Sequence, residues 1–137
     1  MKLSEPKIQV HNAMLTLEWA DWTPTVISWT GGSISGTLIT ARYIQIAKTV
    51  YYYFRWNANG SGNTLAALGF TFPTTSPLES YNTSIGVGRE VTNSGLAIQV
   101  LYSTTGGTDY AKVQLHNTST AISNSRGLTC AGQYRVA

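Results

Sequence analysis

Two apolar segments separated by a single lysine dominate the middle of the chain. Residues 38–47 and 49–56 lie on either side of Lys48, and Tyr51–Trp56 contains three tyrosines, a phenylalanine and a tryptophan. Such bulky side chains crowd a helix but fit a pleated strand, so both segments are predicted to be β-strands. Because no helix-length spacer separates them, the two strands are expected to form a hairpin around which the rest of the fold is built.

Both faces of this hairpin are apolar. Side chains alternate between the two faces of a strand, and residues 38–47 carry large apolar side chains at odd and even positions alike. A free antiparallel sheet usually leaves one face polar and wet, so the second face is expected to contact a neighbouring subunit. The alternative is a loop or the N-terminal segment folding over that face. The predicted subunit-contact residues are Leu38, Ile39, Ala41, Tyr43, Tyr51 and Tyr53.

The other segments favour an all-β fold. Charged residues make up only 11% of the chain, and no helix-length amphipathic segment is present. The predicted architecture is an antiparallel β-sandwich, or a jelly-roll-like fold, of about eight strands spanning residues 25–137. Besides the hairpin, the predicted strands are Val26–Trp29, Leu65–Phe72, Ser84–Val91, Leu96–Tyr102, Tyr110–His116 and Leu128–Val136.

Residues 1–24 differ from the rest of the chain. They contain short apolar patches without a hairpin partner, and Pro24 ends them. A terminal segment frays unless something holds it, so this one is expected to anchor the protein on another chain. The alternative is that it packs on its own domain. The predicted anchoring residues are Ile8, Val10, Leu15 and Leu17.

The sequence offers little for catalysis or for binding a metal. The two histidines, His11 and His116, are far apart and lack neighbouring ligands at metal-binding spacing, and no nucleophile or phosphate-binding motif is present. We therefore expect no enzyme activity, no metal and no cofactor. The net charge of +3 comes from cations scattered singly, which disfavours nucleic acid, and no apolar segment suggests membrane insertion. Cys130 is predicted to be a small buried hydrophobe.

A second interpretation of the aromatic residues is carbohydrate binding. Tryptophan and tyrosine rings can stack on sugars while nearby amides bond their hydroxyl groups. The possible glycan contacts are Trp22, Asn57, Asn59 and Asn63. The alternative, which the sequence favours, places the aromatic side chains in the core and at a subunit contact.

A series of short motifs lies within residues 19–76, about half of the chain: Trp22–Thr25, Gly36–Thr37, Ala41–Ile46, Lys48–Val50 and Phe70–Pro73. Their order resembles a β-sandwich module of bacteriophage tail fibres, minor tail proteins and receptor-binding proteins. In that module a W-T-P-T motif and a G-T turn precede a strand, an I-G-K-T-V motif, an aromatic strand and a closing F-x-x-P. Ala47 stands where glycine is usual before the lysine, which suggests an ordinary turn here.

The resemblance implies a virion structural protein without catalytic residues, commonly a homotrimer, made in the host bacterial cytoplasm. The expected role is a tail fibre or receptor-binding tip that contacts host-surface carbohydrate. Residues 1–24 would then bind other virion proteins. Two alternatives stay open: a capsid decoration or head-fibre protein, and a free carbohydrate-binding module.

Overall fold

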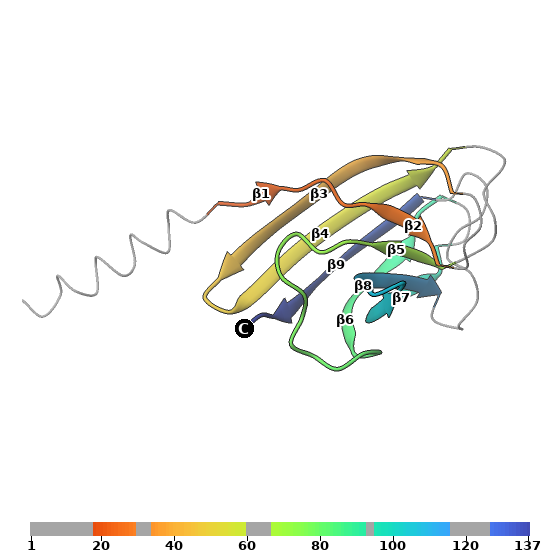
Figure 1. The fold of residues 1–137 in the computed structure, drawn as a ribbon. Coiled ribbons are helices and arrows are strands. Elements are labelled where there is room, and N and C mark those ends of the chain that lie inside the picture. Colours follow the sequence, from red (N-terminus) through yellow and green to blue (C-terminus); the bar gives the residue numbers. More distant parts are fainter. Residues whose placement is uncertain (1–17, 30–33, 60–66, 93–94, 116–126) are drawn as a thin grey trace, which may run out of the picture.

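A computed structural model describes residues 18–29, 34–59, 67–92, 95–115 and 127–137. These residues form nine strands in one antiparallel sheet of order β1-β3-β4-β9-β6-β7-β8-β5-β2, without a helix (Figure 1). The predicted all-β antiparallel class is confirmed. The strands are β1 (Ala20–Asp21), β2 (Val26–Ser28), β3 (Gly36–Ile46), β4 (Thr49–Ala58), β5 (Leu68–Phe70), β6 (Ser84–Glu90), β7 (Ala97–Thr105), β8 (Thr108–Leu115) and β9 (Gly127–Arg135).

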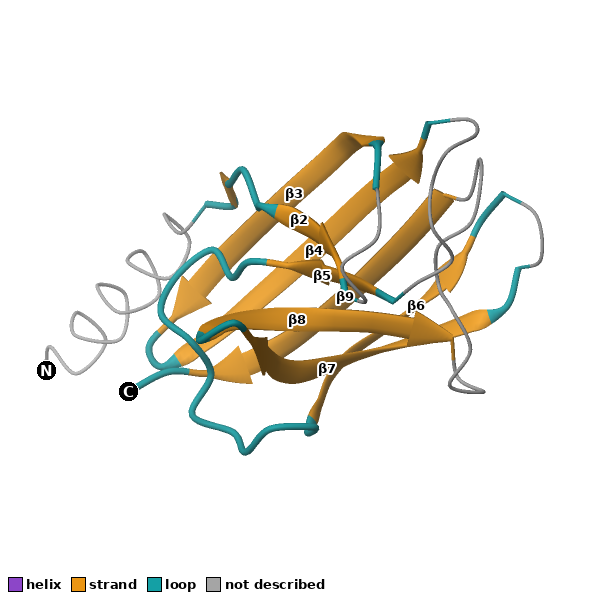
Figure 2. Ribbon diagram, turned by 45° about the vertical axis from the view of Figure 1, so that its right-hand side comes forward, coloured by secondary structure: helices purple, strands orange, loops and turns teal. Residues whose placement is uncertain are grey.

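The sheet curls over itself, so one continuous sheet supplies both layers of the fold. Figure 2 shows β2, β5 and β8 lying across β3, β4 and β9. The two layers meet where Phe54 of β4 stacks on Phe70 of β5, with ring centroids 4.3 Å apart and planes 11° from parallel. Twisted sheets of many strands commonly curl in this way, because curling covers their apolar face.

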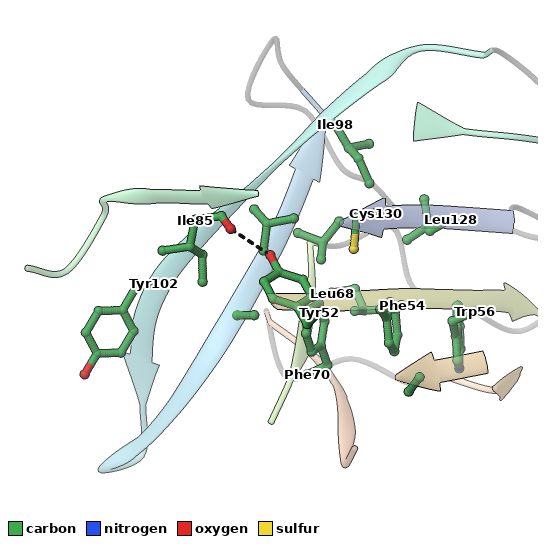
Figure 3. Packing of buried hydrophobic residues seen from close by; sticks show 14 of the residues in the cluster. Tyr52, Phe54, Trp56, Leu68, Phe70, Ile85, Ile98, Tyr102, Leu128 and Cys130 are labelled. Atoms are coloured by element: carbon green, nitrogen blue, oxygen red, sulfur yellow. Dashed lines mark hydrogen bonds between the residues drawn. The ribbon is translucent and has the colours of Figure 1, made fainter. Parts of the chain in front are cut away.

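The core lies between these layers and is rich in aromatic side chains (Figure 3). The even-numbered residues of β4 from Val50 to Trp56 are each 3% exposed or less. The same alternation buries Leu128, Cys130 and Tyr134 in β9, and Cys130 is the small buried side chain that the sequence predicted. Inward residues of β7 and β8 complete the core: Ile98, Val100, Tyr102, Ala111, Val113 and Leu115.

A β-bulge changes which residues of β3 face outward. Leu38 pairs with Trp56 but Thr40 pairs with Arg55, so Ile39 is the extra residue and the alternation shifts after it. Ala41 is consequently 4% exposed, and Leu38 and Tyr43 pack against the core. These three side chains therefore point toward the core, and of the predicted subunit-contact residues Ile39, Tyr51 and Tyr53 are the exposed ones. Simple odd–even alternation did not anticipate this, because it does not account for a bulge.

The β3–β4 turn is also unlike its prediction. Ala47 has a φ of 54°, which lies in the left-handed region. It is the first of the two residues between the paired Ile46 and Thr49, where a type II′ hairpin turn requires a positive φ. The expectation of an ordinary turn is wrong: the closely packed strands impose the angle despite the cost to a residue with a Cβ.

Replacing Ala47 with glycine should therefore stabilise the protein. Removing the Cβ from a residue with a positive φ raises the free energy of unfolding by about 1–2 kcal/mol. Glycine also gives the unfolded chain more conformational freedom, which lowers the free energy of unfolding by about 0.4–1 kcal/mol. We expect a net gain of about 0.5–1 kcal/mol in the free energy of unfolding, measured by urea denaturation. Lys48→Gly is the matched control and should give no gain, because a positive φ occurs at Ala47 and not at Lys48. A loss of stability in Ala47→Gly would contradict the strain.

Part of the predicted 1–24 segment belongs to the sheet. β1 pairs with β3 through Ala20–Tyr43 and Asp21–Arg42. The Trp22 ring then packs on Tyr43 at 6.2 Å between centroids. The boundary proposed at residue 24 thus does not separate the described residues 18–24 from the sheet. The anchoring residues Ile8, Val10, Leu15 and Leu17 lie outside the described residues.

Candidate functional site

The outward-pointing side chains of β3, β4, β9 and β6 form a broad surface, called here the outer face. Because the even residues of β4 fill the core, Tyr51, Tyr53 and Arg55 point the other way. The Tyr53 and Thr129 hydroxyls are 3.1 Å apart, so β4 and β9 contribute to the same face. The outer face exposes five large apolar side chains: Ile39 (47% exposed), Ile46 (39%), Tyr51 (37%), Tyr53 (37%) and Val87 (68%).

Arginines interrupt this apolar surface. Thr129 of β9 pairs with Arg55 of β4 on one side and with Arg89 of β6 on the other. The two arginines therefore flank Thr129. Arg42 pairs with Tyr53 and Arg135 with Thr49, which puts four of the five arginines on the outer face. Arg42 and Arg135 have carboxylate partners, Asp21 at 3.1 Å and Glu79 at 3.4 Å. Among the described residues, Arg55 and Arg89 make no salt bridge.

An open hollow lies at one end of the outer face. It has a volume of about 510 Å³ and is called here the groove. Strands β4, β6 and β9 and the segment before β6 form it, and volumes of this order are usual for small-ligand sites. The lining residues are Thr49, Tyr51, Glu79, Thr83, Ser84, Ile85, Gly86, Val87, Ala131, Gly132, Gln133, Tyr134 and Arg135.

Glu79 is the acidic side chain of the groove, and only one of its oxygens is bonded. Its Oε1 accepts bonds from the backbone N–H and the Nε of Arg135, at 3.2 and 3.4 Å. Its Oε2 is buried and has no hydrogen-bond partner in the described part of the chain. The Glu79 side chain is 16% exposed. A buried carboxylate oxygen without a donor is energetically costly. It is also covered by neighbouring atoms, so a ligand in the groove does not reach it without a rearrangement of the Glu79 side chain.

Two paired glycines let β6 and β9 approach closely beneath the groove. Gly86 pairs with Gly132, and a Cβ at either position would collide with neighbouring atoms. The Tyr52 hydroxyl fills the space below and donates a 3.1 Å hydrogen bond to the Ile85 carbonyl (Figure 3). Burial is the main cause that raises the pKa of Tyr52 well above 10.0, so this hydroxyl remains a donor at neutral pH.

Among the described residues, the predicted glycan contact Trp22 lies apart from Asn57 and Asn59. Trp22 packs on Tyr43 and Phe70, and its indole N–H donates to the Thr71 carbonyl at 3.2 Å. Asn59 accepts a 3.1 Å bond from the Thr37 hydroxyl near the end of β4.

Asn57 lies near the same end of β4, between Thr37 of β3 and Gly127 of β9. Its Oδ1 is buried and makes no hydrogen bond to the described residues. The Trp22 backbone N–H donates to the Ala41 carbonyl, and Ala41 pairs with Phe54 of β4. Phe54 and Asn57 are three residues apart on β4, so Trp22 lies about 10 Å from Asn57 along the strand. Asn63 lies outside the described residues.

Reactive side chains are sparse in the described ranges. No three histidine, cysteine, aspartate or glutamate residues among them gather as a metal site, and none of their segments is a helix able to cross a membrane. Cys130 is buried in the core, and desolvation raises the pKa of its thiol, which keeps it protonated and unreactive. Glu90 is fully buried, with Oε1 accepting the Thr92 backbone N–H at 2.6 Å.

Sequence reasoning identified part of the outer face but missed the groove. The odd-numbered series Tyr51, Tyr53 and Arg55 was visible as a large amphipathic face of β4. By contrast, Glu79 and Arg135 are 56 residues apart, and nothing in their local sequence pairs them. The arginines likewise look scattered along the chain and meet only when β3, β4, β9 and β6 align.

The chain matches no protein-family model, and no curated protein or solved structure is significantly similar to it. The resemblance to the bacteriophage module therefore stays a prediction from the residues that carry it.

Proposed function

We propose that this chain is a bacteriophage virion structural protein, a tail-fibre or receptor-binding tip module that assembles as a homotrimer through its outer face. The observation that supports assembly is the exposure of Ile39, Ile46, Tyr51, Tyr53 and Val87 on one side of the sheet, opposite the core. Tyrosine and arginine beside aliphatic side chains is the composition typical of protein interfaces. The location on a virion rests on the motif resemblance alone.

The arginines favour a cyclic arrangement over a two-fold dimer. In a two-fold dimer the same patch meets itself, which would bring Arg55 and Arg89 of one copy close to those of the other. Like charges brought together at a contact oppose association. In a cyclic trimer the outer face meets a different surface of the neighbour, so this repulsion is avoided. A trimer is also the state that the resemblance implies.

Two other roles compete with this one. A capsid decoration or head-fibre protein would use the same assembling face at another place on the particle. A free carbohydrate-binding module would use the groove and stay monomeric. Electron cryomicroscopy of the particle separates the first from a tail protein, and the solution mass separates the second.

Ile39→Asp should dissociate the trimer without unfolding it. Ile39 is the bulge residue of β3 and is 47% exposed, so the monomer tolerates a charge there. A carboxylate buried without a partner at a contact costs about 3 kcal/mol, which weakens association roughly 100-fold. Sedimentation equilibrium should give the Ile39→Asp variant one third of the mass of the wild-type protein. The variant should keep the melting temperature of the folded monomer.

Tyr81→Asp is the matched control, because Tyr81 is an exposed apolar residue that contacts Tyr102 of β7 and Asp109 of β8 rather than the four strands of the outer face. It should leave the trimer intact. Tyr43→Asp should instead unfold the protein, since Tyr43 packs against the core. A wild-type protein that is monomeric at high concentration, or an Ile39→Asp trimer of unchanged affinity, would rule out assembly through this face.

A further inference from the structure

We infer that the outer face of one copy binds the β1 edge of its neighbour in the trimer. The β1 edge is defined here as Glu18 and Trp19, the two exposed residues that directly precede β1. In this contact Glu18 lies between Arg55 and Arg89 of the other copy, and the ring of Trp19 packs on Tyr53 of that copy. The contact rests on the proposed homotrimer and identifies the surface that the outer face meets.

The outer face carries two arginines without a carboxylate partner. Arg55 and Arg89 are exposed, flank Thr129 and make no salt bridge among the described residues. The hydroxyls of Tyr53 and Thr129 are 3.1 Å apart, so an aromatic ring lies beside the two cations. A charge buried without a partner opposes association. A surface that covers this part of the outer face must therefore supply a carboxylate and an apolar group next to it.

One described carboxylate meets both requirements. Five acidic residues lie in the described ranges, and two of them, Asp21 and Glu79, already bind arginines. Glu90 is fully buried, and Asp109 accepts a hydrogen bond from a tyrosine hydroxyl. Glu18 is exposed, makes no salt bridge to the described residues and is followed directly by an exposed tryptophan. Charge and composition therefore favour the β1 edge as the surface that covers the arginines.

Trp19 supplies the apolar part of the contact. It is 44% exposed, and tryptophan is among the residues that most often dominate the binding energy of an interface. Arg42 holds the backbone at this point: its guanidinium donates to the Trp19 carbonyl at 3.3 Å and to Asp21 Oδ1 at 3.1 Å. Because the β1 edge is already ordered in the monomer, its docking costs less conformational entropy.

The charges of Glu18 and Arg55 cannot meet within one copy. Ala20, which follows the β1 edge, pairs with Tyr43 of β3. Arg55 pairs with Thr40, which is three residues or about 10 Å further along β3. Strands β1 and β4 also lie on opposite sides of β3. An ion pair between these groups therefore joins two copies.

The position of the β1 edge allows a ring to close. β1 lies at one margin of the sheet, next to β3 (Figure 1). A margin that meets a face turns each copy relative to the one before it, and repetition of that turn can close a cyclic oligomer. Contact between two opposite faces would instead stack the copies without closure. An edge-to-face contact is thus consistent with the proposed trimer.

The test measures trimer affinity by sedimentation equilibrium on the full chain carrying Glu18→Arg, Arg55→Glu or both changes. Each single reversal brings like charges together and should weaken association roughly tenfold or more. The double variant restores opposite charges at this contact, so it should associate more tightly than either single variant. Trp19→Ala should also weaken association roughly tenfold or more, because it removes the apolar part of the contact.

Asp109→Arg is the matched control for the charge reversals. Asp109 belongs to β8 and accepts a bond from Tyr81, away from both the β1 edge and the outer face. Its reversal makes the same change in net charge as Glu18→Arg and should leave the trimer intact. The melting temperature of each variant, measured by circular dichroism, checks that the monomer stays folded.

Two kinds of failure can be told apart. A wild-type protein that is monomeric at high concentration would overturn the homotrimer and this contact with it. A wild-type trimer that Ile39→Asp dissociates, but that Glu18→Arg and Trp19→Ala leave unchanged, would overturn the contact alone. The contact would also be overturned if the double variant associated no better than the single variants, or if Asp109→Arg dissociated the trimer and Glu18→Arg did not.

Discussion

Gly132→Ala is expected to lower the free energy of unfolding by at least about 3 kcal/mol, because the added methyl group has no space. A Cβ at Gly132 would overlap the Ile85 carbonyl oxygen and lie 2.6 Å from the Gly86 Cα. Both are backbone atoms of β6, so no side-chain rotation relieves the collision. The strands β6 and β9 would have to separate, which also breaks the Tyr52–Ile85 hydrogen bond.

Gly69→Ala provides a matched control for this prediction. It makes the same substitution at another strand glycine, where the nearest atoms are the side chains of Ile27 and Trp29, at 3.0 and 3.2 Å. These side chains can move by a few tenths of an ångström, so the cost should stay below about 1 kcal/mol. Urea denaturation of both variants measures the difference. Equal stabilities would mean that β6 and β9 are not held as closely as described.

Phe70→Ala should cost about 4 kcal/mol, in the range measured for large aromatic residues in cores. Phe70 is 1% exposed and stacks on Phe54 across the two layers (Figure 3). It also contacts Tyr52 edge-on at 5.9 Å. Since β5 is only three residues long, Phe70 is a large share of what holds β5 and β2 against β4. A loss of this size is a considerable fraction of the stability of an ordinary domain.

A double-mutant cycle isolates the stacked pair. We expect Phe54→Ala and Phe70→Ala together to cost less than the sum of the single changes, with a coupling of about 1 kcal/mol. Phe72→Ala is the comparison, because Phe72 is only partly buried and should cost less than Phe70→Ala. Coupling near zero between Phe54 and Phe70 would show that the two layers are not joined through this contact.

The alternation of apolar residues was sufficient to predict most of the strands. Inward residues in β4, β7, β8 and β9 follow the two-residue period of their sequences, and each predicted strand overlaps an observed one. The prediction succeeded because burying one face of a strand requires this period, and the requirement is local. The short strand β1 was missed because its two exposed residues carry no such pattern.

Three features depended on contacts between distant parts of the chain. The bulge at Ile39 turned Ala41 and Tyr43 toward the core, which the odd–even alternation of β3 did not predict. The curl of a single sheet brought Phe54 onto Phe70. The third feature, the position of Trp22 on the core, removed it from the expected glycan platform.

The sequence by itself therefore determined that the chain forms antiparallel strands and that the central hairpin is apolar on both faces. Only the tertiary structure decided what each face meets, where the arginines gather, and that Glu79 and Arg135 share a groove with Tyr51. The physical reason is the distance along the chain over which the deciding interactions act. Strand formation depends on side chains two residues apart, whereas a site depends on strand order and register, which are set by packing across the whole sheet.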